Sequence, residues 1–268
     1  EPQNDHRTRM YQQLVGSLAY ISTFTRPDVA RAHSVLARHL QNPGQKHIGA
    51  AYQVWRYLLR TKYLAISASG DNLQNSYYLT KPEEAGDELI FYGASDAAFA
   101  DDPERKSSQG YLFSLYGLPI DWKATVQRSV TKSTTEAELL ALSLAGSELI
   151  WWKRLFKQVN FELGIRPTLF CDNQQTVRII NKAENRLNTK MRHVDTHQMW
   201  LRQEAEAGHL QVNWMATNQM PADGLTKLLS SQKHSTFVEQ LGLINISELL
   251  QGRSGGEENS HSLYQHQL

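Results

Sequence analysis

The sequence has almost no cysteine: Cys171 is the only one among 268 residues. A single cysteine excludes an intrachain disulfide framework and any zinc cluster built from several cysteines, and it fits a reducing intracellular compartment. The first residues, EPQNDHRTRM, are polar and contain no apolar core of a signal peptide. No run approaches the roughly 20 apolar residues of a membrane span. We therefore expect a protein that is not secreted and does not contact a membrane.

Several catalytic motifs are also missing. The sequence has no glycine-rich phosphate loop, no HExxH and no G-x-S-x-G, and no motif marks Cys171 as a nucleophile. These absences disfavour P-loop NTPases, HExxH zinc proteases and serine hydrolases. We expect Cys171 to pack inside a strand.

Neither sign of charge is in clear excess overall, because the formal net charge is only +1. Total charge therefore does not mark a nucleic-acid binder. Between Trp122 and Arg192, however, 12 Lys and Arg stand against 6 Asp and Glu. A basic surface and an ordinary solvated charged face both explain this surplus.

The first part of the chain is predicted to be helical. Leu14, Leu18 and Ile21 recur at helical spacing. Pro27 suits the first turn of a second helix, and a third helix follows. The predicted helices cover 9–24, 27–41 and 47–61. Because the chain begins with Glu1 rather than Met, we also expect it to be part of a longer protein.

From Leu89 the pattern changes to strands that later alternate with helices, which predicts a mixed α/β sheet covered by helices. A last helix is expected to begin near Pro221. The polar end of the chain, 251–268, is predicted to be disordered. The predicted strands are 89–96, 110–117, 118–125, 168–172 and 210–216, and the predicted helices are 134–159, 173–182 and 194–208.

Three aspartates lie at ends of predicted elements, where a site built over a sheet edge would draw its ligands. Asp96 ends the first of these strands, although a turn-forming role is open and Asp101 and Asp102 compete with it. Asp172 ends the strand TLFCD, but Asp or Asn before a helix also makes a good N-cap. Asp223 lies in the first turn after Pro221, where the helix dipole alone could explain it.

Two glutamates at the start of the long helix can be separated by their surroundings. Ser133 and Glu136 match a capping box, which accounts for Glu136. Glu138 shares the apolar face of the helix with Leu142 and Leu149, where an unpaired carboxylate is costly. A metal ligand and a structural salt bridge both explain Glu138.

Taken as a set, the four carboxylates suit Mg²⁺, which prefers oxygen ligands. Two such ions about 4 Å apart can clamp the attacking and leaving oxygens of a phosphodiester. The candidate catalytic and metal-ligating residues are Asp96, Glu138, Asp172 and Asp223.

The stretch from Tyr92 to Lys227 resembles the ribonuclease H domain of copia-type LTR retrotransposon polyproteins. The matching blocks are YGASDAAFADDPERKSSQGYLF, PIDWKATVQRSVTKSTTEAELLAL, FCDNQQTVRIINK, NTKMRHVDTHQMWLRQE and NQMPADGLTK. The segment YQQLVGSLAYISTFTRPDVARAHSVLARHLQNP is similar to the part that links the reverse transcriptase polymerase to its ribonuclease H. The resemblance covers roughly residues 10 to 245.

The resemblance implies an α/β fold, a ribonuclease H-like mixed five-stranded sheet with flanking helices, preceded by a helical connection segment. It divides the chain into a connection segment at 1–82, a ribonuclease H domain at 83–229, a C-terminal helix at 230–250 and the tail at 251–268. The expected place of action is the cytoplasm, in virus-like particles, or the nucleus.

The resemblance also implies an activity. The four carboxylates would hold two Mg²⁺ ions and support hydrolysis of the RNA strand of an RNA–DNA hybrid during reverse transcription. The upstream polymerase part of the same polyprotein is the implied partner. Many relatives have an acid and a Trp where this chain has Ala98 and Phe99, and often a histidine where Met199 stands. Near Met199, His193 and His197 are candidates for proton transfer or product release, or are ordinary helical histidines.

Contacts with the nucleic acid are expected to be mainly to phosphates, with 2′-hydroxyl contacts marking the RNA strand. Basic residues in two segments are candidates. Those singled out are Lys153, Arg154, Lys190 and Arg192, with Lys157 and Arg186 beside them.

Two other functions remain open from the sequence. One is a catalytically dead or domesticated remnant that still folds and binds nucleic acid, although the presence of all four acids argues against decay of the site. The other is an integrase or transposase of the same fold class. The late position of Asp223 and the helix placed directly after three strands disfavour that class.

Overall fold

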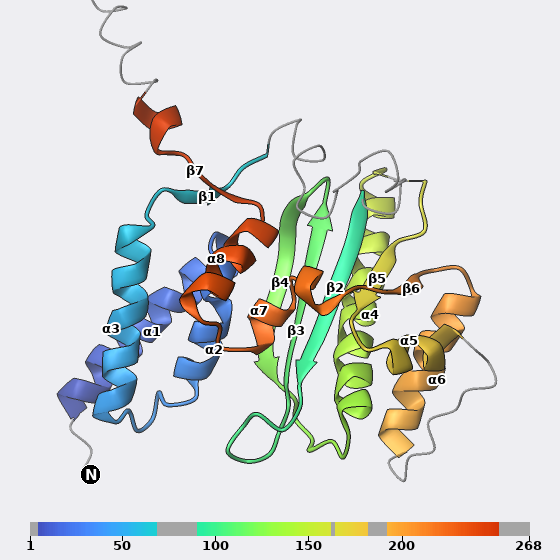
Figure 1. Cartoon of the computed structure of the whole chain (residues 1–268), viewed down its shortest axis with the longest axis horizontal. Coiled ribbons are helices and arrows are strands. Elements are labelled where there is room, and N and C mark those ends of the chain that lie inside the picture. Colours follow the sequence, from blue (N-terminus) through green and yellow to red (C-terminus); the bar gives the residue numbers. More distant parts are fainter. Residues whose placement is uncertain (1–4, 69–89, 162–163, 182–191, 252–268) are drawn as a thin grey trace, which may run out of the picture.

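The computed structural model of the chain describes residues 5–68, 90–161, 164–181 and 192–251. The expected boundary between 82 and 83 and the expected tail after residue 251 lie outside this part. Figure 1 shows a sheet with helices on both sides and a bundle of helices from the N-terminal segment packed beside it.

The main sheet has five strands in the order β4-β3-β2-β5-β6. Strands β2, β3 and β4 are antiparallel neighbours, whereas β2, β5 and β6 run parallel. The mixed five-stranded sheet expected from the sequence is therefore confirmed. Its strands are β2 (Phe91–Ala98), β3 (Ser108–Leu115), β4 (Leu118–Val126), β5 (Thr168–Cys171) and β6 (Gln211–Trp214).

A tight turn joins β3 to β4. Tyr116 and Gly117 have φ values of 51° and 76°, so both central residues of this two-residue turn are left-handed. Such turns match the twist of an antiparallel hairpin, and glycine at the second position carries little strain.

Helix α4 (Thr134–Gln158) covers one face of the sheet. Its buried side chains Leu142 and Leu149 pack with Phe91 and Phe113 of the strands. Burying an apolar side chain of this size stabilises the fold by about 1.5–3 kcal/mol relative to leaving it exposed. The same core takes residues from α5 (Gln174–Asn181) and α6 (Arg192–Glu206).

The other face of the sheet is covered by short elements from both ends of the chain. Leu112 of β3 packs with Leu225 and Phe237, and Ala30 from the N-terminal segment joins them. The covering helices are α2 (Ala30–Ala37), α7 (Asp223–Thr226) and α8 (Ser231–Gln240), and the turn η3 (Thr217–Gln219) precedes α7.

The N-terminal segment forms its own small core and also packs against the sheet. Its further elements are α1 (Asp5–Phe24), η1 (Pro27–Val29) and α3 (Gln45–Arg60), so the three predicted helices are confirmed, the second ending at Ala37 rather than 41. The indole N–H of Trp122 in β4 donates to the carbonyl of Ser22 at 2.6 Å.

A small second sheet joins the two ends of the described chain. Strand β1 (Leu64–Ile66) pairs antiparallel with β7 (Leu243–Asn245), and neither strand was predicted. The helix expected over 230–250 is only partly correct, because α8 ends at Gln240. Gly242, with φ of 65°, takes the left-handed conformation that commonly terminates a helix.

Candidate active site

The site begins where β2 and β5 run parallel to the same edge of the sheet. Ser95 pairs with Cys171 at the end of β5, so Asp96 and Asp172 are the next residue of each strand path. Strand β2 continues to Ala98, so Asp96 lies inside the strand rather than at its end. Asp96 is 1% exposed, which excludes the turn-forming role that the sequence left open.

The two competing acids after Asp96 have structural partners instead. Asp101 accepts hydrogen bonds from the backbone N–H and the hydroxyl of Ser108 and forms an ion pair with Arg31 at 2.8 Å. Asp102 accepts from the backbone N–H of Glu104 at 2.7 Å and pairs with Arg38. These contacts fix the β2–β3 loop and account for both carboxylates.

Helix α4 presents its two glutamates differently, as predicted. Glu136 donates its backbone N–H to the hydroxyl of Ser133 at 3.1 Å, and its carboxylate accepts the N–H of Lys132 at 2.7 Å. The cap is therefore present, with the return bond one residue earlier than expected. Glu138 is buried, accepts a hydrogen bond from the backbone N–H of Ala97 at the end of β2, and faces Asp96.

Asp172 is free of the capping role that was its alternative. The N-terminus of α5 is capped by Asn173, whose side-chain oxygen accepts the N–H of Thr176 at 3.1 Å. The Asp172 carboxylate instead accepts a hydrogen bond from the hydroxyl of Thr217 at 2.9 Å. Trp214 donates to the Asp172 carbonyl at 2.9 Å, which fixes the backbone of the same residue.

Asp223 is carried to the site by α7, which it begins. Its carboxylate is paired with the ammonium of Lys227, four residues later. The same ammonium lies 3.9 Å from Asp96. The hydroxyl of Thr226, also on α7, donates to Asp96. Helix α7 therefore joins the fourth acid to the first.

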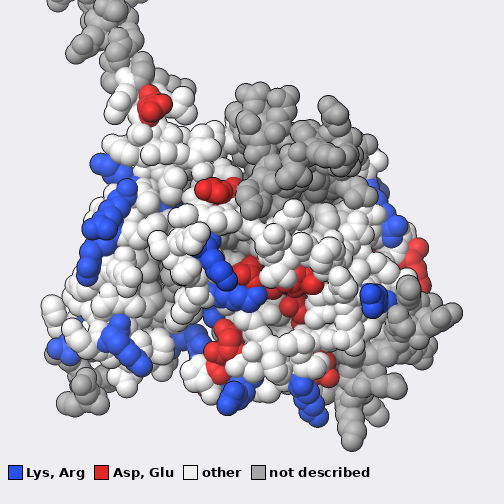
Figure 2. Space-filling view, viewed as in Figure 1, with Lys and Arg blue, Asp and Glu red and all other residues white. Residues whose placement is uncertain are grey.

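Asp96 interacts electrostatically with each of the other three acids, and Glu138 also interacts with Asp172. Burial, and to a smaller extent the charges of Asp172 and Asp223, raise the pKa of Asp96 to about 6, although Lys227 and Thr226 oppose the rise. Burial, followed by the charges of Asp96 and Asp172, raises the pKa of Glu138 well above its usual range. Figure 2 shows acidic side chains gathered in the middle of this face, with basic side chains directly beside them.

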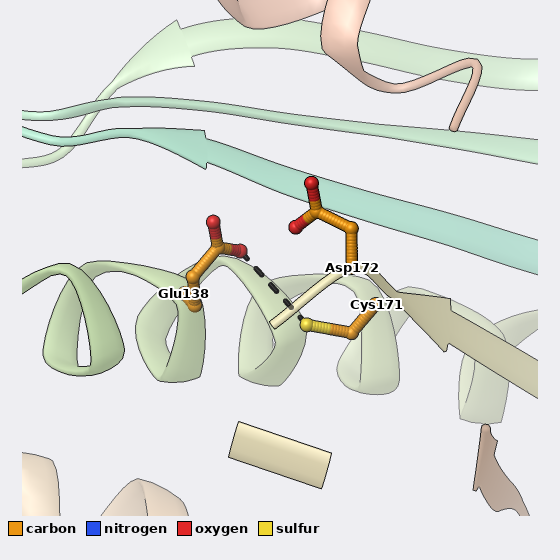
Figure 3. Close-up of side chains that lie close together, drawn as sticks. All are labelled: Glu138, Cys171 and Asp172. Atoms are coloured by element: carbon orange, nitrogen blue, oxygen red, sulfur yellow. Dashed lines mark hydrogen bonds between the residues drawn. The ribbon is translucent and has the colours of Figure 1, made fainter. Parts of the chain in front are cut away.

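Cys171 lies against this group. Figure 3 shows Glu138 extending from α4 and Asp172 from the end of β5, with the Cys171 thiol beside Glu138. The sulfur is 4.0 Å from a Glu138 oxygen, and one ligand atom from each residue lies within 4.8 Å of the others. Burial raises the pKa of the Cys171 thiol, so it stays protonated and is a poor metal ligand. Its packing in the strand is confirmed.

The donor set fits a hard divalent cation. Asp96 and Glu138 are buried carboxylates held by rigid elements, and their pKa values are raised because like charges meet in a desolvated place. A bound divalent cation would relieve that repulsion. Oxygen-only ligands are those that Mg²⁺ prefers.

Three residues of the site were not singled out from the sequence. Thr226 and Lys227 belong to the block ADGLTK, in which the sequence identifies only Asp223 as a candidate, and both contact Asp96. Thr217 donates a hydrogen bond to Asp172. The sequence signal for Lys227 was its spacing of four from Asp223, which favours an ion pair on a helix.

The predicted nucleic-acid contacts stay predictions. Lys153 and Arg154 lie on α4, and Lys153 is fifteen residues beyond Glu138, which is about 22 Å along a helix axis. Lys153 donates to the carbonyl of His209 at 2.7 Å. Four other predictions lie outside the described part: Arg186 and Lys190, and the side chains of Arg192 and His193.

His197 has a described partner. Its Nδ1 lies 2.7 Å from the hydroxyl of Ser143 on α4. This contact joins α6 to α4 and gives the histidine a structural role. Met199, two residues further along α6, is 44% exposed.

Comparison with known proteins gives a family. No family model matches the chain. "Retrovirus-related Pol polyprotein from transposon TNT 1-94" of Nicotiana tabacum is 36% identical over 237 residues, 87% of this chain and 16% of that protein. "Retrovirus-related Pol polyprotein from transposon RE2" of Arabidopsis thaliana is 30% identical over 88% of this chain and 15% of that protein. The chain belongs to the retrovirus-related Pol polyproteins of transposons.

The chain thus spans about one sixth of the length of the Pol polyproteins that it matches. A shorter relative, "Secreted RxLR effector protein 161" of Plasmopara viticola, is 37% identical over 53% of this chain and 89% of that protein. Among solved structures, LC11-RNase H1 from compost is similar with a TM-score of 0.41 and 13% identity, over 51% of this chain and 92% of that one.

None of the helices in the described part of the chain combines the length and hydrophobicity needed to span a bilayer.

Proposed function

We propose that this chain is the ribonuclease H part of a retrotransposon reverse transcriptase, which hydrolyses the RNA strand of an RNA–DNA hybrid with the help of Mg²⁺. The observation that supports this proposal is that four acids from separate elements lie at one site. They are Asp96, Glu138, Asp172 and Asp223. In the sequence alone, each of these residues also has an ordinary structural explanation. Their convergence at one sheet edge is what a metal-dependent phosphodiesterase requires.

In this proposal the four carboxylates hold the metal, with two ions as the working number. Bound Mg²⁺ would neutralise phosphate charge and favour attack by water on the phosphodiester. The role of the chain is to supply oxygen ligands at fixed positions. Asp96 is held by the hydroxyl of Thr226, Asp172 by that of Thr217, and Glu138 by the backbone of Ala97.

The binding of the hybrid is also part of the proposal. A hollow of about 390 Å³ includes Asp223 in its lining, together with the polar side chains of Asn218, Lys233 and Thr236 and the apolar side chains of Met220, Leu229 and Phe237. Its ammonium, amide and hydroxyl groups suit phosphate and sugar oxygens. The upstream polymerase part of the same polyprotein is the proposed partner, and the cytoplasm, within virus-like particles, or the nucleus is the proposed place of action.

The test is a substrate panel. The purified chain is incubated with an RNA–DNA hybrid, duplex DNA, duplex RNA and single-stranded RNA of the same sequence, in Mg²⁺ and in EDTA. We expect cleavage of the RNA strand of the hybrid in Mg²⁺, and none in EDTA. Equal cleavage of all four substrates, or cleavage that persists in EDTA, would contradict the proposal.

A second candidate is a folded remnant without catalysis. It is favoured by the match to the effector-named protein of Plasmopara viticola, because the segment similar to this chain makes up 89% of that protein. A related segment thus occurs outside a long polyprotein. Cooperative unfolding together with hybrid binding, but with no cleavage in Mg²⁺ or Mn²⁺, would favour this candidate.

A further inference from the structure

Lys227 enters the acidic site from the side that faces solvent. Its side chain is 41% exposed, whereas that of Asp223 is 21% exposed and that of Asp96 is 1% exposed. The ammonium pairs with Asp223 and lies 3.9 Å from an oxygen of Asp96. The ammonium thus bridges the partly exposed Asp223 and the buried Asp96.

The position of Lys227 is fixed by the fold. Helix α7 is anchored to the sheet through Leu225, which is buried against Leu112 of β3. Thr226, next to it, bonds to Asp96. The lysine follows directly, so its ammonium is aimed at the same carboxylates that α7 brings together.

The negative charges of the site favour a positive charge at the position of Lys227. Carboxylates gathered in a desolvated place repel one another, and each needs a nearby positive charge. Partial burial opposes the charge on Lys227, but Asp96 and Asp223 outweigh that effect and raise its pKa, so the ammonium stays charged. A tethered cation and a metal ion would contact the same oxygens of Asp96 and Asp223.

We propose that Lys227 is a positioning residue that stands in for the metal: it holds Asp96 and Asp223 together in the metal-free protein and yields those oxygens when Mg²⁺ binds. This inference rests on the proposed function, since it needs a metal site at these acids. It adds that the Lys227 ammonium competes with the first Mg²⁺ ion for these oxygens and thereby sets the affinity of that ion.

The proposal predicts opposite effects on the stability of the metal-free protein and on the affinity for Mg²⁺, which a lysine with only a structural role would not produce. If Mg²⁺ must displace the ammonium, the stability that Lys227 gives to the metal-free protein is subtracted from the free energy of metal binding. Removing the lysine should therefore weaken the metal-free protein and tighten Mg²⁺ binding together.

The experiment compares the wild-type chain with Lys227→Met and Lys227→Arg. Thermal midpoints are measured in EDTA and in saturating Mg²⁺, and Mg²⁺ affinity is measured by calorimetry. Lys106→Met is the matched control, because Lys106 is a similarly exposed lysine paired with Glu104 at 2.7 Å and has no contact with the acids of the site among the described residues.

For Lys227→Met we expect a Tm about 2–4 °C below wild type in EDTA, and a smaller difference in Mg²⁺. The Kd for Mg²⁺ should fall about 3–10-fold. Lys227→Arg keeps the charge and should stay near wild type in EDTA, and Lys106→Met should leave the Kd unchanged.

Two results would overturn the inference, and they can be told apart. If Lys227→Met lowers Tm equally in EDTA and in Mg²⁺ and leaves the Kd unchanged, the lysine is only structural and the proposed metal site stands. If neither wild type nor variant responds to Mg²⁺, the metal site itself fails, and this inference fails with it.

Discussion

Glu136 and Glu138 lie two residues apart on one helix but have opposite surroundings. Glu136 accepts a backbone N–H at the helix start, and any side chain with a suitably placed oxygen could do the same. Glu138 is buried near Asp96 and Asp172, and its raised pKa reflects burial first and their charges second. These surroundings identify Glu136 as a helix cap and Glu138 as a candidate metal ligand.

Replacing these two glutamates tests that separation. Glu138→Gln keeps the shape but removes a charge that the metal needs, so cleavage of the hybrid should fall by more than the roughly 10–100-fold typical of residues behind metal ligands. Glu136→Gln is the matched control and should change cleavage and stability little, because Gln also completes a capping box. Rates of RNA-strand cleavage and urea unfolding curves give the answer. Equal losses in both variants would contradict the assignment.

Asp96 gives a prediction about pH. Burial raises its pKa to about 6 in the folded protein, above its ordinary value of 3.8, so between these values the folded protein binds more protons than the unfolded chain. Ionisation of Asp96 therefore destabilises the metal-free protein as the pH rises through this range. In EDTA, the free energy of unfolding should fall more steeply from about pH 4 to 7 in wild type than in Asp96→Asn. Parallel curves would mean that Asp96 does not titrate in this way.

At this scale the sequence predicted some assignments better than others. Glu138 could be chosen because helical periodicity places it on the apolar face and the capping box accounts for its neighbour. Asp96 and Asp172 could not be chosen by local pattern, since turn and cap roles explain such residues equally well. The structure is needed to exclude these roles. The pairing of β2 with β5 places Asp96 inside a paired strand, and Asn173 rather than Asp172 caps the next helix.

At the scale of elements, helix α7 depends on a close approach to the sheet. Gly110 pairs with Asp96 across β2 and β3, and a Cβ there would lie 2.7 Å from the Cβ of Leu225 and 3.1 Å from the carbonyl oxygen of Lys123. The absence of a side chain at Gly110 thus allows α7 to carry Asp223 to the other acids.

Adding that Cβ should move α7. For Gly110→Ala we expect a loss of about 1–3 kcal/mol in the free energy of unfolding, as for other overpacked sites. Cleavage should also fall, because Asp223 moves away from Asp96. Gly49→Ala is the control: a Cβ there meets nothing within 4 Å, and alanine favours the interior of α3. Wild-type stability and cleavage in Gly110→Ala would show that α7 does not need this contact.

Long elements with a clear period were predictable, and short ones were not. Helix α4 is found at 134–158, within one residue of the prediction, because its apolar face repeats over many turns. Strands β1 and β7 have three residues each and are defined only by pairing with each other across the length of the chain. No local pattern of three residues could have predicted that pairing.

At the scale of the whole molecule, the N-terminal segment and the sheet are held together by several kinds of contact. Strand β1 pairs with β7, Arg31 forms an ion pair with Asp101, and the ring nitrogen Nε2 of His234 lies 3.0 Å from the carbonyl oxygen of Asp28. Ala30 also joins the apolar core on the sheet. Periodicity showed that the helices needed a partner, but it could not show that the partner is this sheet.

These contacts predict that a break in the chain will not separate the two parts. With a protease site placed between residues 69 and 89, the cut protein should elute as one complex in size-exclusion chromatography and keep its cleavage activity. The β1–β7 pairing and the shared core hold the pieces together without the peptide link. Elution as two separate pieces would contradict this prediction, and the uncut protein serves as the control.

The most direct measurement of the central claim is cleavage of one RNA–DNA hybrid, labelled on both strands, by wild type and by Asp96→Asn prepared identically. In Mg²⁺, wild type should shorten only the RNA strand, and Asp96→Asn should leave both strands intact while unfolding as cooperatively as wild type. Equal cleavage by both proteins, or an intact RNA strand with folded wild type, would contradict the claim that these four acids form a ribonuclease site.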